Sequence, residues 1–222
     1  MSRQAWLGIE CYQEIVLQLS NKIYFWLIAL ACVVSFFSSF GSKLNLIEPI
    51  FFNKFLISLN QIQFYDFKTT YLVGNEWWRL ITPMFIHFSP THLIFNSLWI
   101  YILGREIEQL DGKIIFIFLI LFTSISSNYL QYSFSGPSLF GGLSGVVYGL
   151  LGYCFVSETF LRINKFSFPP AIYIFMFVWL LIGFTGFLDL LGFGKIANFA
   201  HLGGLLSGIL SGYIFSMYNK KT

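Results

Sequence analysis

The sequence predicts an all-α membrane protein, a polytopic bundle of six transmembrane helices with a long, partly membrane-embedded first loop. Two observations carry this prediction. Of the 222 residues, 56% are apolar and 10% are charged, whereas soluble domains carry about 25% charged residues. The apolar residues also gather in stretches of about 20 between polar breaks, which is the length of helix that crosses a bilayer.

The expected helices lie between these polar breaks. They are Ile23 to Phe40, Thr91 to Leu103, Ile114 to Tyr132, Gly142 to Val156, Ile172 to Leu191 and Ala197 to Met217. The second and fourth are short and carry polar residues or glycines, as do spans that line cavities inside a bundle. We expect residues 23–217 to form one membrane core between a cytoplasmic segment at 1–22 and a cytoplasmic tail at 218–222. Residues 1–21 lack the pattern of a cleavable signal, so the first helix should remain as an anchor.

The connection from Gly41 to Pro90 is longer than is usual between neighbouring helices. It includes the segment LIEPIFFNKFLISLNQIQFY, which is rich in apolar and aromatic residues. We therefore expect this loop to lie in the membrane interface or against the bundle.

Lysine and arginine favour one orientation in the membrane. With a cytoplasmic N-terminus, the inside segments hold Arg3, Lys22, Arg105, Lys113, Arg162, Lys165, Lys220 and Lys221, and the outside segments hold Lys43, Lys54, Lys68, Arg79 and Lys195. This modest bias predicts that both termini are cytoplasmic. The net charge of +3 is too small and too scattered to favour a nucleic-acid partner.

Cysteine and histidine spacing gives no sign of a disulfide framework, a metal or a cofactor. Cys11, Cys32 and Cys154 are not paired by spacing. The histidines are His87, His92 and His201, and no His-Glu-x-x-His motif is present. On a helix, a separation of five residues would point His87 and His92 about 140° apart, which disfavours a shared metal ion.

Polar residues within the expected spans fall at one depth. If the spans alternate from a cytoplasmic N-terminus, the second, fourth and sixth all begin at the outer face. His92 and Asn96 lie near the start of the second span, Ser144 near the start of the fourth and His201 near the start of the sixth. The topology thus predicts that these side chains gather on the outer side.

Small residues predict which helices approach closely. Gly145 and Gly149 are four apart on the fourth span, and the sixth span carries a ladder made of Ala200, Gly204, Gly208 and Gly212. Such ladders let helix backbones approach closely in lipid. Packing through these faces would bring Ser144 within reach of His201.

That meeting predicts nucleophilic catalysis by a Ser/His dyad. A serine hydroxyl needs a base to take its proton, and histidine suits that role. His92, Asn96 and the Ser144 backbone N–H are candidate donors to an oxyanion. Glycines at 141, 142 and 145 would let the chain turn sharply and a substrate come close. Asp189 is a carboxylate near the outer end of the fifth span, but spacing does not bring it to His201.

Each of these residues also has a simpler, non-catalytic interpretation. Gly-x-Ser-Gly occurs as a packing element in membrane helices, His201 could be a packing residue or proton relay, and Asn96 could join two helices. Trp77, Trp78 and Arg79 read by default as an interfacial aromatic belt with a snorkelling cation. A channel or transporter would need the polar residues to continue to the inner side, where the sequence turns to leucine, isoleucine and glycine.

Three segments carry a family resemblance. They are EWWRLITPMFIHFSPTHLIFNSLWIYILGREIE, SGPSLFGGLSGVVYGLLGY and ANFAHLGGLLSG. They resemble, in the same order, the Trp-Arg, His-x4-His-x3-Asn, Gly-x-Ser-Gly and Ala-His-x2-Gly motifs of rhomboid intramembrane serine proteases of the bacterial GlpG type. The resemblance covers roughly residues 76–208 and implies a serine endopeptidase of the bacterial inner membrane that cleaves single-pass membrane proteins, with its active site open to the outer side.

The resemblance also implies residue roles. Ser144 corresponds to the nucleophile and His201 to the base, and His92, Asn96 and the Ser144 amide correspond to the oxyanion hole. Supporting roles fall to Tyr148, which packs on the catalytic histidine, to Arg79 and Glu108, which brace the first loop and the inner end of the second span, and to His87 in the first loop. The fifth span and the loop Gly192 to Asn198 resemble a lateral gate and a cap. A folded N-terminal domain is common in this type but is not expected from the 22 residues before the first span. A catalytically silent relative that binds membrane helices is the alternative.

Overall fold

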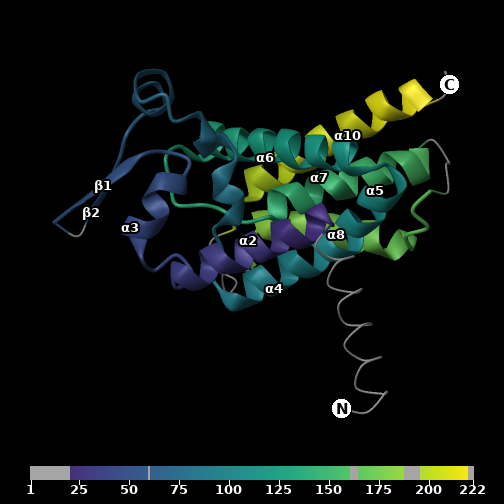
Figure 1. The fold of residues 1–222 in the computed structure, drawn as a ribbon, viewed down its shortest axis with the longest axis horizontal. Coiled ribbons are helices and arrows are strands. Elements are labelled where there is room, and N and C mark those ends of the chain that lie inside the picture. The colour runs from purple at the N-terminus through teal and green to yellow at the C-terminus, as the bar shows by residue number, and fades with distance from the viewer. Residues whose placement is uncertain (1–20, 60, 161–164, 188–195, 220–222) are drawn as a thin grey trace, which may run out of the picture.

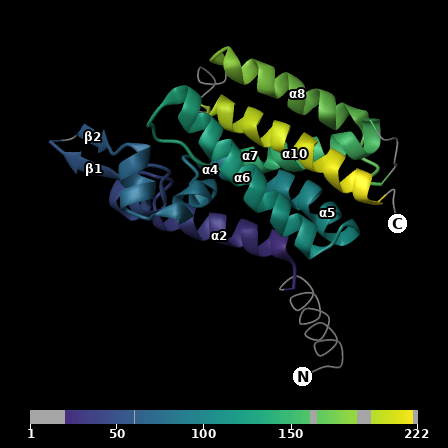
Figure 2. The ribbon, with the colours of Figure 1, turned by 90° about the horizontal axis from the view of Figure 1, so that it is seen from above.

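The computed structural model describes residues 21–59, 61–160, 165–187 and 196–219. An elongated bundle of helices makes up most of it, and a small hairpin projects from one end (Figure 1). The main helices are α2 (Ile23–Phe37), α4 (Pro90–Trp99), α5 (Arg105–Leu110), α6 (Lys113–Ser135), α7 (Ser144–Phe155), α8 (Pro170–Phe184) and α10 (Asn198–Asn219). Figure 2 shows α8 and α2 on opposite edges of the bundle, with α7 between them.

Two predicted helices extend further than expected. After α4, a π-helical turn at Ile100–Gly104 leads directly into α5, so the second helix runs on from Pro90 to Leu110. After α7, a similar turn covers Val156–Phe160. Charged residues follow the apolar run of the second helix but do not end the helix. Trp99 and Arg105, which flank the π-helical turn, both have helical dihedral angles.

Length and apolarity alone do not identify six spanning helices. Among the described helices, α6 is the one that is both long and apolar enough to cross a bilayer, and α2 and α8 are apolar but shorter. The helices that carry the candidate site residues contain glycines and polar side chains, which lower their mean hydropathy.

The long first connection is folded and packs against the end of the bundle. It contains α3 (Leu44–Ile47), a 3-10 turn at Glu48–Ile50, strands β1 (Phe55–Ser58) and β2 (Gln61–Phe64), a π-helical turn at Lys68–Val73 and 3-10 turns at Trp77–Leu80 and Thr82–Phe85. The antiparallel strands pair Phe55 with Phe64, so this loop adds a hairpin to the predicted all-α fold. Phe52 and Tyr71 from the loop pack with Phe140, which precedes α7.

Arg79 is buried, and the reading of it as a snorkelling cation is wrong. Its side chain is 2% exposed and forms ion pairs with Glu76 and with Glu48, the latter at 3.0 Å. It also donates to the backbone carbonyl groups of Glu48 and Phe51. Burial alone would raise the pKa of Glu76, but hydrogen bonds from Lys54 and Arg79 outweigh it and lower that pKa. Arg79 therefore holds the loop together from inside.

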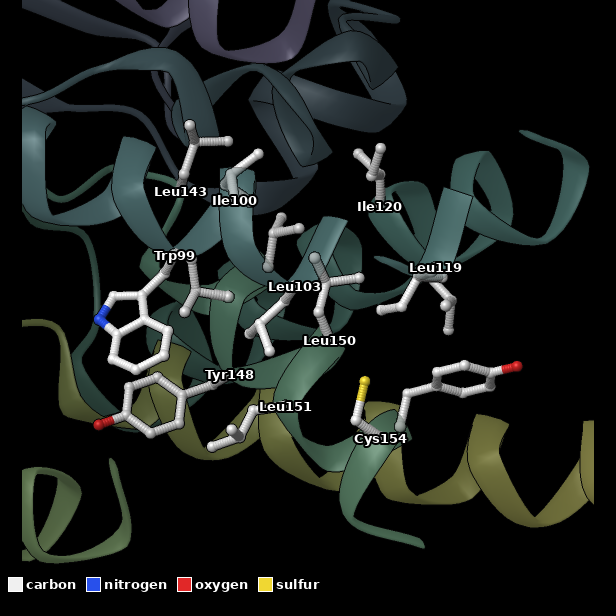
Figure 3. Packing of buried hydrophobic residues seen from close by; sticks show 14 of the residues in the cluster. Trp99, Ile100, Leu103, Leu119, Ile120, Leu143, Tyr148, Leu150, Leu151 and Cys154 are labelled. Carbon is white, nitrogen blue, oxygen red and sulfur yellow. The ribbon is translucent and has the colours of Figure 1, made fainter. Parts of the chain in front are cut away.

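The core of the bundle forms around α7, in which every residue from Gly145 to Cys154 is buried. Figure 3 shows this core, with Trp99, Leu103, Leu119 and Leu150 directed into it from three parts of the chain. The predicted small-residue packing of α7 against α10 is confirmed.

Glycine is required where α7 and α10 meet. A Cβ atom on Gly204 would overlap the carbonyl oxygen of Gly145, and one on Gly208 would overlap that of Gly149. The same is true from the other side, since a Cβ on Gly152 would lie 2.6 Å from the carbonyl oxygen of Leu205. The two backbones therefore touch along the ladder.

Glu108 joins the start of α2 to α5. Its carboxylate, 5% exposed, accepts hydrogen bonds from the N–H of Ile23 at 2.9 and 3.1 Å and from that of Tyr24 at 3.1 Å. The N-cap residue of α2, Lys22, makes no side-chain cap of its own. Glu108 thus acts as an N-cap from another helix.

Replacing Glu108 with alanine should destabilise the fold by about 2 kcal/mol, because N–H groups at the start of α2 lose their acceptor. The measurement is the thermal unfolding midpoint in detergent. The matched control is Glu106→Ala, which removes a carboxylate from the same helix and should leave the midpoint nearly unchanged. Equal midpoints in both variants would contradict the capping role.

Candidate active site

Ser144 and His201 meet where α7 and α10 begin. The Nε2 atom of His201 lies 2.8 Å from the Oγ atom of Ser144. Ser144 is the first residue of α7, and the chain reaches it through Gly142, whose φ of +115° favours glycine. The N–H of Ala200, next to His201, donates to the Oε1 atom of Gln131 on α6 at 3.1 Å. The two helix starts are therefore fixed relative to each other.

Tyr148 lies one turn after Ser144 and supports the histidine ring. The Tyr148 and His201 rings stack with centroids 4.7 Å apart and planes inclined by 27°. The Tyr148 hydroxyl donates to the carbonyl oxygen of Met176 on α8 at 3.0 Å. This packing limits rotation of the imidazole and keeps its Nε2 atom toward Ser144.

His92 and Asn96 face the same point from α4. The first turn of α4 is capped by Ser89, whose hydroxyl accepts from the N–H of His92 at 3.1 Å. A Cβ atom placed on Gly142 would lie 2.7 Å from the Cε1 atom of His92 and 3.6 Å from the Nδ2 atom of Asn96. The Asn96 amide nitrogen is buried and has no hydrogen-bond partner in the described residues. It is a free donor close to Gly142, two residues before Ser144.

His87 lies in the loop before α4 and not on the helix. The predicted angle of 140° between His87 and His92 therefore does not apply, and their ring centroids are 4.9 Å apart. The N–H of Leu143 donates to the Nε2 atom of His87 at 3.3 Å. Burial lowers the pKa of His87 to about 3, so the ring is neutral and accepts this bond. His87 thus supports the segment that leads into Ser144.

A cavity of about 300 Å³ opens in front of these groups. Ser144, His201, His92 and Asn96 supply its polar wall. The rest is mostly apolar and aromatic, formed by Phe88, Phe95, Leu139, Phe140, Val147, Tyr148, Met176, Trp179, Ile196 and Ala197 among others. The cavity is large enough for a short extended peptide segment and suits apolar side chains.

The described residues hold no cluster of three or more histidine, cysteine, aspartate or glutamate side chains arranged for a metal ion. Within that part of the chain, no carboxylate forms an ion pair with His201. Asp189 and most of the loop Gly192 to Asn198 lie outside the described residues.

Sequence reasoning missed a polar stripe on α6. Ser124, Ser127, Asn128 and Gln131 are buried and spaced three and four residues apart. Gln131 supports α10 as described above, and the Ser127 hydroxyl lies beside the position of a Cβ on Gly145. The helical spacing of these polar residues within an apolar span was the signal that could have revealed them.

Comparison with known proteins gives consistent matches. A family model described as Rhomboid domain matches residues 74–218. The rhomboid protease GlpG of Serratia proteamaculans is 39% identical over 136 residues, which are 61% of this chain and 47% of the relative. That of Haemophilus influenzae is 36% identical over 149 residues, 67% of this chain and 74% of the relative. That of Klebsiella pneumoniae is 34% identical over 146 residues, 66% of this chain and 51% of the relative. The chain thus spans about half the length of the Serratia and Klebsiella relatives.

Proposed function

This chain belongs to the rhomboid family, and we propose that it is an intramembrane serine endopeptidase that cuts single-pass membrane proteins in or near their transmembrane segment. Its helical fold and family make it an all-α membrane protein. The observation that carries the proposal is the 2.8 Å contact between His201 and Ser144 at the wall of an apolar cavity. The relatives named above are called rhomboid proteases, which supports the same activity.

In the proposed reaction, the Ser144 hydroxyl attacks the carbonyl carbon of the scissile bond, and its proton passes to the Nε2 atom of His201. His201 then gives this proton to the leaving amine, the C–N bond breaks and an acyl group remains on Ser144. A water molecule then attacks the acyl carbon while its proton passes to His201. The bond between that carbon and the Oγ atom of Ser144 breaks, His201 returns the proton to Oγ, and the carboxyl product leaves. No cofactor is required.

Negative charge would develop on the substrate carbonyl oxygen, and we propose that three donors stabilise it. These are the Asn96 amide, the His92 ring and the N–H of Ser144, which has no intrahelical partner because it opens α7. The unpaired state of the Asn96 amide supports this role, since a buried donor without a partner otherwise costs free energy.

Asn96→Ala should lower kcat by about 10- to 100-fold. This is less than the loss expected in a site with two donors, because two other proposed donors remain. The measurement is kcat and KM for cleavage of a single-span substrate in liposomes. Ser97→Ala, also on α4, is the matched control and should retain wild-type kcat. A larger effect of Ser97→Ala than of Asn96→Ala would contradict the assignment.

The proposed arrangement in the membrane follows from the positive-inside bias. It has six spans, both termini in the cytoplasm and the cavity open to the outer side of a bacterial inner membrane. The first loop lies partly in the outer interface, and residues 23–217 form the protease core. Cysteine labelling of exposed residues at the two ends of the bundle in intact cells tests the orientation.

The activity is tested with purified protein in liposomes that contain a single-span substrate. We expect one or a few cuts near the outer end of the substrate span and labelling of Ser144 by a fluorophosphonate. Binding of the substrate without cleavage or labelling would favour the alternative, a catalytically silent rhomboid-like protein that binds membrane helices.

A further inference from the structure

One wall of the cavity is formed by α8, which packs on the bundle along a single face. Met176 and Trp179 of this helix line the cavity. The buried residues of α8 form one narrow stripe, Tyr173, Met176, Leu180 and Gly183. Its other faces are exposed in the protein, as at Ile174, which is 65% exposed. Between its ends, α8 is held by the hydrogen bond from Tyr148 to the carbonyl oxygen of Met176 and by the stacking of Trp179 on Phe95. The groups at the two ends of α8 add to these contacts in setting the position of the wall.

At the end of α8 near the site, the helix contacts the start of α10 through a hydrogen bond and a pair of rings. The Asn198 amide donates to the carbonyl oxygen of Gly183 at 2.8 Å. The rings of Phe184 and Phe199 lie 5.5 Å apart, edge to face.

At the opposite end, charged groups hold α8. The Tyr173 hydroxyl donates to the Oε2 atom of Glu158 at 2.5 Å, and the N–H of Phe168 donates to its Oε1 atom at 3.2 Å. The Tyr173 ring also packs edge to face on Phe155 at 5.5 Å. The Glu158 carboxylate, in the π-helical turn after α7, thus binds both the segment before α8 and the first turn of α8.

A second pair fixes the approach to α8. Lys165 forms an ion pair with Asp111, which lies between α5 and α6 and has a side chain that is 2% exposed. Lys165 also lies 5.7 Å from the centroid of the Phe166 ring, and that ring packs against Tyr153 of α7 at 6.0 Å. We call Asp111, Glu158, Lys165 and Tyr173 the far-end clamp. Buried or half-buried charges in an apolar bundle are costly, and removing one partner leaves the other unpaired.

We propose that Glu158 and Tyr173 are positioning residues for substrate binding, because their hydrogen bond sets where α8 places Met176 and Trp179 in the cavity wall. Tyr173 and Met176 are one turn apart on the same buried stripe of α8. A shift of Tyr173 therefore moves the wall that a substrate segment contacts, while Ser144 and His201 stay on α7 and α10. This inference rests on the proposed protease function.

The test is Tyr173→Phe in the liposome assay. We expect KM for a single-span substrate to rise by roughly tenfold, the value of one hydrogen bond to a charged group, with kcat nearly unchanged. The rate at which a small fluorophosphonate labels Ser144 should stay at the wild-type level, since that probe needs no wall contact. Tyr129→Phe removes the hydroxyl of a half-exposed tyrosine on α6 and is the matched control.

Variants of Glu158 separate positioning from general instability. Glu158→Gln keeps an oxygen acceptor for Tyr173 and should retain a KM close to wild type, whereas Glu158→Ala also removes the acceptor of the Phe168 N–H and should raise KM at least as much as Tyr173→Phe. The double variant Glu158→Ala with Tyr173→Phe should be no worse than Glu158→Ala alone, because the bond from Tyr173 is already lost in that single variant. Equal losses in labelling and cleavage, or an unchanged KM in Tyr173→Phe, would overturn the proposal.

A direct distance measurement keeps the test independent of activity. Spin labels at Ile174 and Ile114, both exposed, report the position of α8 relative to α6 after Cys11 and Cys32 are replaced with serine. The distance distribution should broaden in Tyr173→Phe and stay narrow in Tyr129→Phe. If the wild-type protein neither cleaves nor labels, the protease function fails, and an unchanged distribution in Tyr173→Phe would refute the clamp by itself.

Discussion

Replacing Ser144 or His201 with alanine should reduce cleavage of a single-span substrate by at least about 10³-fold. Ser144→Ala removes the oxygen proposed to attack the substrate. His201→Ala leaves that oxygen in place but removes the proposed base, whose Nε2 atom lies 2.8 Å away. The measurement is the rate of product formation in liposomes, followed until the wild-type reaction is complete.

The two variants should also lose fluorophosphonate labelling, because labelling uses the same activated hydroxyl. Ser144→Ala should unfold near the wild-type temperature, since it loses one hydrogen bond. His201→Ala also loses the stacking of its buried ring on Tyr148 and should unfold at a lower temperature, so its activity is measured where it is folded. Ser133→Ala on α6 is the control, because its exposed hydroxyl bonds to the carbonyl oxygen of Tyr129. Cleavage at the wild-type rate by Ser144→Ala would exclude Ser144 as the nucleophile.

The sequence predicted the meeting of Ser144 and His201 because local periodicity determines it. Glycines four residues apart on two helices define contact faces, and the depth of a residue follows from its distance to the end of its span. These rules need no knowledge of the other helices. The close contact between Gly204 and Gly145 in the structure agrees with the contact faces that these rules predict.

Other features depend on contacts between distant parts of the chain, which periodicity does not contain. Arg79 looks like an interfacial cation until Glu48, 31 positions earlier, is brought to its side. The turn that carries α4 into α5 is helical although charged residues follow it. Glu158 and Tyr173 lie in separate helices, and their bond depends on how the chain returns to begin α8. The hydropathy of a sequence indicates which segments are apolar enough for a membrane, but it does not indicate which distant residues pair with each other.

Replacing Gly204 with alanine should unfold the protein at a markedly lower temperature, by an amount equivalent to about 3 kcal/mol or more. The added methyl group overlaps the carbonyl oxygen of Gly145, and backbone atoms cannot turn aside as a side chain can. On its other side Gly145 is also in close contact, since a Cβ there would overlap the side chain of Ser127 on α6. Because α7 is confined between α6 and α10, the methyl group can be accommodated only by separating α10 from α7.

That separation predicts a second effect, which distinguishes the ladder from ordinary core packing. Gly204 is one turn from His201, so displacing α10 lengthens the contact between His201 and Ser144 and should lower kcat even below the unfolding temperature. The measurements are the unfolding midpoint in detergent and kcat at a temperature where the variant is folded. Leu210→Ala, at an exposed position on the same helix, should leave both nearly unchanged. A folded Gly204→Ala protein with wild-type kcat would show that α10 moves without carrying His201, and the two helices would then not form the rigid support that the site requires.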